Sequence, residues 1–71
     1  MNAAAWTVAR VIAEMPPVKI RIRGKVTEGR LTGRSLPFPM VSVGRGDARE
    51  SYEFAWETVA NCLNENRALT V

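Results

Sequence analysis

The sequence has no histidine and a single cysteine, Cys62. An intrachain disulfide is therefore impossible, and a zinc site of the usual Cys/His kind is excluded. The lack of histidine also removes the side chain that most often serves as a general base near neutral pH. Cys62 falls in an apolar helical pattern with no base beside it, which predicts a buried, unreactive thiol. The scattered carboxylates form no recognisable acid–base pair. We expect no enzyme, no catalytic residue, no metal and no cofactor.

Long apolar runs are missing as well. No stretch approaches the roughly 18 apolar residues that a membrane helix needs. The N-terminal residues carry no cluster of positive charge, and Arg10 interrupts the apolar stretch that a secretory signal would require. These features predict a cytoplasmic protein without a membrane partner. The 71 residues predict one small domain spanning 1–71. Such a chain buries only about 60% of its unfolded surface, so self-association as a homodimer stays open as a further source of stability.

Charge is unevenly distributed along the chain. Ten lysines and arginines against seven acids give a net charge of +3. Residues 15–46 hold seven cations and one acid, a net charge of +6, whereas residues 47–71 hold two cations and five acids, a net charge of −3. The middle of the chain is therefore basic and its C-terminal third acidic.

The first half of the chain predicts a helix and then strands. Residues 3–14 place apolar side chains at helical spacing, with Asn2 as N-cap and Pro16-Pro17 as the stop. Residues 18–26 alternate, with apolar side chains at even positions and Lys or Arg at odd ones, as in a strand with two unlike faces. Gly24 interrupts the apolar face and suggests a bulge or the close approach of another element. The Thr27-Glu28-Gly29 segment predicts a turn, and a second strand is expected to begin near Arg30.

The second half offers one clear strand and one ambiguous segment. Prolines 37 and 39 mark a break, and residues 40–43 predict a third strand. Residues 51–54 alternate like a strand, but an apolar stripe over residues 48–65, preceded by a near capping box from Asp47 to Glu50, favours a helix. Residues 68–71 form a tail that could add a strand. The predicted fold is α+β in the order αβββα, a small antiparallel sheet with two helices packed on one face.

The odd positions of the first strand are the strongest functional feature. Like charges two residues apart on a strand repel by about 0.6 kcal/mol per adjacent pair even in water. The strands supply few acids to offset this, because Glu28 is expected in the turn. A polyanion lying across the row would neutralise it, which predicts a nucleic-acid-binding or regulatory accessory protein that contacts DNA or RNA phosphates. The predicted contacts are Lys19, Arg21, Arg23, Lys25, Arg30 and Arg34.

Two other interpretations remain open at this point. The row could be a solvated strand face that discourages aggregation. Alternatively, the chain could be a protein-interaction module, an adaptor or inhibitor that docks to an acidic partner or self-associates through its basic sheet and acidic helix. In that case one exposed aromatic among carboxylates on the second helix would anchor the contact. The protein-contact candidates are Phe54, Glu50, Glu53 and Glu57.

Overall fold

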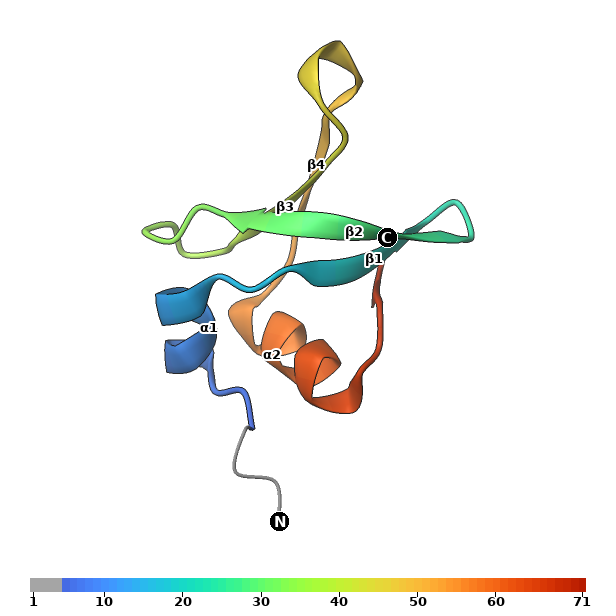
Figure 1. Cartoon of the computed structure of the whole chain (residues 1–71). Coiled ribbons are helices and arrows are strands. Elements are labelled where there is room, and N and C mark those ends of the chain that lie inside the picture. Colours follow the sequence, from blue (N-terminus) through green and yellow to red (C-terminus); the bar gives the residue numbers. More distant parts are fainter. Residues whose placement is uncertain (1–4) are drawn as a thin grey trace.

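The computed structural model describes residues 5–71 of the chain. In this part the elements are α1 (Val8–Glu14), β1 (Val18–Ile22), β2 (Lys25–Thr32), β3 (Met40–Val43), a 3-10 turn η1 (Gly46–Ala48), β4 (Glu50–Glu53), α2 (Trp56–Glu65) and β5 (Leu69–Thr70). The strands form one sheet in the order β4-β3-β2-β1-β5. Both helices lie on the same side of β1 and β2, and β3 and β4 rise from them as an arm (Figure 1). The predicted α+β class is confirmed.

The sheet is mixed, which differs from the prediction of a small antiparallel sheet. The pairs β1–β2, β2–β3 and β3–β4 are antiparallel, but β5 runs parallel to β1, with Leu69 opposite Ile20. The strand β5 can run parallel because α2 carries the chain from one edge of the sheet to the other before it pairs. The order αβββα is therefore wrong in detail, since β4 and β5 are added to it, and the tail does contribute a strand.

The first hairpin turns earlier than predicted. Arg23 and Gly24 have φ angles of 52° and 78°, and they connect Ile22 to its partner Lys25. Positive φ at both central residues is the signature of a tight two-residue hairpin turn. The expected strand over 18–26 is thus divided in two, and the predicted turn at 27–29 is wrong. Those residues lie inside β2, which begins at Lys25 rather than near Arg30.

Gly29 allows the sheet to curl. Residues 25–29 of β2 pair with β1, and residues 30–32 pair with β3. A Cβ atom at Gly29 would lie 2.5 Å from Cγ1 of Val41 and 3.4 Å from Cγ2 of Ile20. Only a residue without a side chain lets β3 come this close over β2. We call the sheet face that carries Ile20 the inner face and the opposite one the outer face.

The predicted helix over 48–65 is wrong in its first half. Residues 50–53 form β4, which pairs with β3 from Val43 opposite Glu50 to Met40 opposite Glu53. Asp47 does not cap a helix but lies in η1, and α2 begins only at Trp56. The strand interpretation of this segment is the better one, because pairing with β3 satisfies its backbone groups. The third strand, Met40–Val43, has the predicted bounds.

The helix α1 is short and held at both ends. Its N-cap is Thr7, whose Oγ1 accepts a hydrogen bond from the Arg10 amide at 3.1 Å, while the predicted cap Asn2 lies outside the described residues. It ends at Met15 in the left-handed region, just before Pro16. The segment before it is fastened to α2, because Asn64 accepts from the Trp6 amide at 2.5 Å and donates to the Trp6 carbonyl at 2.8 Å.

The core lies between the inner face and the two helices. The predicted burial of the even positions in β1 is confirmed, and so is that of Cys62. Val26 was expected on the same face but is 43% exposed, because the turn at 23–24 intervenes. The buried apolar residues are Val11, Val18, Ile20, Ile22, Leu31, Val41, Val59, Ala60, Cys62 and Leu69.

Candidate nucleic-acid interface

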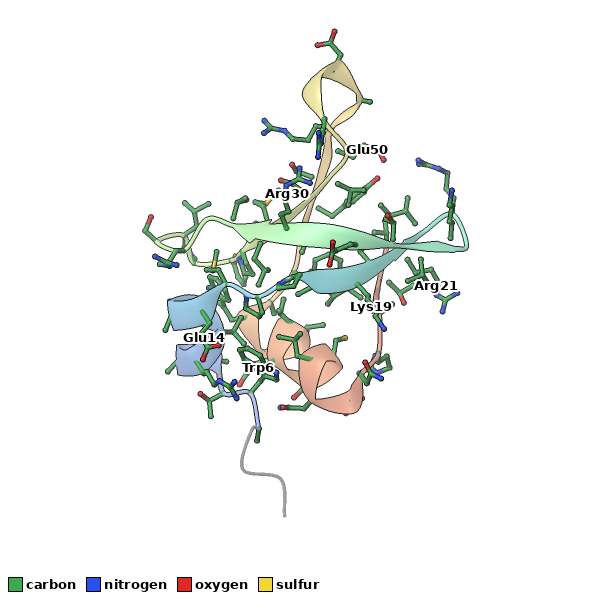
Figure 2. All side chains as sticks on the ribbon, viewed as in Figure 1. Trp6, Glu14, Lys19, Arg21, Arg30 and Glu50 are labelled. Atoms are coloured by element: carbon green, nitrogen blue, oxygen red, sulfur yellow. The ribbon has the colours of Figure 1, made fainter. Side chains whose placement is uncertain are left out.

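Two members of the predicted basic row lie where they were expected. Lys19 and Arg21 project from the outer face of β1, and both are exposed. Their partners on β2 are Glu28 and Val26. Glu28 is therefore not a turn residue but a strand acid directly opposite Lys19, which lowers the repulsion within the row. Figure 2 labels both residues along β1.

The other two members of the row leave the outer face. Arg23 occupies the hairpin turn, and its Nη2 lies 3.3 Å from Oε1 of Glu50. This hydrogen bond, and next the charge of Glu50, raise the pKa of Arg23 above its ordinary value. Lys25 is the cross-strand partner of the buried Ile22, so it belongs to the inner face at the exposed end of the hairpin. A single row of four cations does not exist.

Arg30 and Arg34 are engaged with the backbone of the protein itself. Arg30 donates to the carbonyl of Gly44 at 2.8 Å from the outer face of β2. Arg34 donates from Nε to the carbonyl of Ile12 at 2.8 Å and from Nη2 to that of Ala13 at 3.5 Å. Arg34 therefore caps the C-terminal end of α1, where a cation is favoured by the helix dipole. Both side chains therefore stabilise the fold through hydrogen bonds to the backbone.

The ten cations fall into two groups of five. The arginines at positions 10, 23, 30, 34 and 67 each have a hydrogen bond or ion pair within the protein. Among residues 5–71, the remaining five have no such partner, and all are exposed. They lie either on the β1–β2 hairpin or in the loop 44–49 at the end of the arm. We call them the unpaired cations: Lys19, Arg21, Lys25, Arg45 and Arg49.

Arg45 and Arg49 are the members of this set that the predicted contacts did not include, and of these Arg49 was assigned to the wrong element. The helical interpretation of residues 48–65 places it on a helix, four residues before Glu53. In the structure it follows η1 and precedes β4, with φ −73° and ψ 131°. The signal that could have located it is the Gly44-Arg45-Gly46 sequence, because glycines at φ 84° and 55° form the end of a long hairpin there.

The predicted protein-contact residues do not share a surface. Glu50 and Glu53 belong to opposite faces of β4, paired with Val43 and Met40 respectively. Phe54 follows the strand, donates its amide to the carbonyl of Pro39 and is half-buried against the core. Glu57 lies in the first turn of α2. The expected placement of an aromatic residue among carboxylates on one helix face is therefore wrong, whereas the role of these residues in a protein contact stays a prediction.

A cavity of about 320 Å³ opens between the turn of the hairpin and the part of the arm next to the loop 44–49. Its walls are the last pair of β1–β2 and the last pair of β3–β4, together with the turn and Thr27. The Arg23–Glu50 ion pair bridges the two sides. We call this cavity the hollow; its lining residues are Ile22, Arg23, Lys25, Thr27, Val43 and Glu50.

Nothing in residues 5–71 groups three or more potential metal ligands, and Cys62 is 4% exposed. Across the same residues, no helix has the length and apolar character to cross a membrane. Comparisons of the chain with models of protein families, with curated proteins and with solved structures find no match. The functional argument therefore rests on the cations and on the hollow.

Proposed function

We propose that this chain is a small non-enzymatic nucleic-acid-binding protein that contacts phosphates through its unpaired cations. One observation carries the proposal. Half of the ten cations are satisfied by the protein, and the other half lie on the hairpin and in the loop 44–49 of the arm. Exposed cations with no protein partner are the groups that bind a phosphate backbone, since they release its condensed counterions.

The structure changes the predicted set of contacts. Arg30 and Arg34 leave it, because their guanidinium groups already hold backbone carbonyls. Arg45 and Arg49 enter it from the loop of the arm. The proposed contacts are thus Lys19, Arg21, Lys25, Arg45 and Arg49, with Arg23 beside them. Phosphate contacts of this kind position a strand but carry no direct sequence information.

The salt dependence of binding tests the proposal. Fluorescence anisotropy with a labelled mixed-sequence oligonucleotide should show binding at low salt. If all five unpaired cations contact phosphates, the logarithm of the association constant should fall with the logarithm of salt with a slope of about −3.5 to −4.5. Arg21→Ala should weaken binding several-fold and make the slope shallower by about 1.

Arg67→Ala is the matched control, because it removes the same charge from an exposed arginine already paired with Glu65. It should leave the affinity nearly unchanged. Equal losses for the two variants would mean that net charge alone drives binding, and absence of binding at low salt would contradict the proposal. Polyglutamate added as a competitor tests the alternative of an acidic protein partner. Under that alternative, polyglutamate should displace the labelled oligonucleotide at least as well as an unlabelled oligonucleotide does.

A further inference from the structure

The hollow has the size of a site for one small ligand. Its volume of about 320 Å³ lies at the lower end of the range of roughly 300–1,000 Å³ typical of ligand pockets. It lies where the turn end of the hairpin faces the last pair of β3–β4, next to the loop 44–49. A polymer cannot enter it, but a single unit of one can.

The lining residues make three chemical demands on an occupant. Lys25 has no partner among the described residues, and Arg23 has N–H donors beyond the one given to Glu50, so an anionic group is favoured. The Glu50 carboxylate, with a side chain 41% exposed, accepts hydrogen bonds and therefore favours an occupant that also carries donors.

The third demand is for apolar surface. Ile22 and Val43 provide aliphatic walls, and Thr27 also lines the hollow. Ile22 is only 7% exposed, so it forms a fixed floor rather than a mobile side chain. An occupant thus needs an anion, hydrogen-bond donors and an apolar body in one small molecule.

We infer that the hollow binds one nucleotide unit, with its phosphate at Lys25 and Arg23, a donor group at Glu50 and its base against Ile22 and Val43. The choice of a nucleotide rests on the proposed function. A base inside a duplex is stacked and paired and cannot enter, so the occupant is either a nucleotide in a single strand or a free nucleoside monophosphate. The two sources share the same chemistry.

Titration of the ¹⁵N-labelled protein with adenosine 5′-monophosphate, followed by NMR, tests the site directly. Saturable amide shifts are expected at Thr27, Val43 and Glu50. Lys25→Ala should weaken this binding about tenfold or more. Arg67→Ala is the control, because Arg67 is exposed, does not line the hollow and is already paired with Glu65. It should change the affinity less than twofold.

A second measurement, fluorescence anisotropy with a ten-nucleotide single strand and with its duplex, distinguishes the two sources of the occupant. It also distinguishes failure of this site from failure of the proposed function. A preference for the single strand that Lys25→Ala reduces and Arg67→Ala preserves supports a nucleotide within a strand. Equal affinities beside saturable monophosphate shifts support the free nucleotide. Monophosphate shifts without any oligonucleotide binding overturn the proposed function and leave the site standing. Absence of shifts at the hollow overturns this inference even where both oligonucleotides bind.

Discussion

Gly29 is the residue on which the shape of the sheet depends. It lies on the inner face of β2, and Val41, which is fully buried, occupies the space where its side chain would be. Val41 has no room to retreat because its own neighbours are close-packed. The curl of the sheet therefore depends on one missing methyl group.

Gly29→Ala should destabilise the protein by about 1–3 kcal/mol, the usual cost of overpacking a core. Urea unfolding followed by tryptophan fluorescence measures the change. The double variant with Val41→Ala provides the control, since removing the Val41 methyl groups makes room for the new Cβ. The double variant should be more stable than the two single changes added together would give. Simple additivity would show that Val41 is not what excludes a side chain at position 29.

The arginines show why residue type alone does not assign a role. Arg30 and Arg34 look in the sequence like extensions of a basic patch, yet each bonds to a carbonyl brought near by the fold. The carbonyl bound by Arg30 lies 14 positions away along the chain, and those bound by Arg34 lie 21 and 22 positions away. Sequence reasoning could not separate them from Arg21 or Arg45, because the difference lies entirely in tertiary contacts.

At the scale of elements, α1 depends on such a contact. It has seven residues, fewer than an isolated helix needs to be stable in water. Two of its last carbonyls accept hydrogen bonds from Arg34, which lies in the loop between β2 and β3 and not in the helix.

Arg34→Ala should lower the stability of the protein by about 0.5–1.5 kcal/mol, through the lost hydrogen bonds and the lost charge at the helix end. Hydrogen exchange should show the largest loss of protection in the α1 amides. Arg45→Ala is the control, since it removes the same charge from a side chain without a partner in the described part of the chain. It should leave stability within about 0.5 kcal/mol. Equal effects of the two variants would argue against the capping role.

In the β1–β2 hairpin, the sequence correctly predicts which side chains face the core before the turn but not after it. The apolar positions of β1 were correctly assigned to the core, because alternation is unambiguous within one strand. Across a two-residue turn, however, even residues before the turn share a face with odd residues after it. Lys25 therefore joins Ile22 on the inner face. The Arg23-Gly24 turn carries no Asn-Gly or Asp-Gly signal, so the alternation seemed to continue through it.

The segment from 48 to 65 shows that a local pattern can fit two kinds of secondary structure. Its second half was correctly predicted as a helix, and Val59 and Cys62 are buried as expected. Its first half satisfies both a helical stripe and a strand alternation, and local pattern cannot decide between them. The decision comes from β3, whose free edge offers partners to residues 50–53. A long-range pairing of this kind is not visible in the segment itself.

On the scale of the whole molecule, charge and shape are arranged together. The described residues form a small, elongated body with a radius of gyration of 11.9 Å and extents of 41 × 27 × 16 Å. All five unpaired cations lie on the hairpin and the arm, and the two acids of α2, Glu57 and Glu65, lie on the helical side (Figure 1). A polyanion is therefore expected to meet the hairpin and the arm and to avoid α2.

The composition also determines how this binding responds to pH. With no histidine in the chain, no side chain has its ordinary titration between pH 5.5 and 7.5. The hydrogen bond to Glu50 raises the pKa of Arg23, and that to Glu65 raises the pKa of Arg67. A raised pKa in the folded state adds stability at all lower pH values, which is lost only as pH rises beyond about 12.

Affinity for an oligonucleotide should therefore change less than about twofold between pH 5.5 and 7.5 at constant ionic strength, as measured by fluorescence anisotropy. Arg21→His supplies the control, because it places an exposed group of ordinary pKa near 6.5 among the unpaired cations. That variant should bind more tightly at pH 5.5 than at pH 7.5, whereas Arg21→Ala should be as flat as the natural chain. A tenfold fall with rising pH in the natural chain would mean that a group other than these cations controls binding.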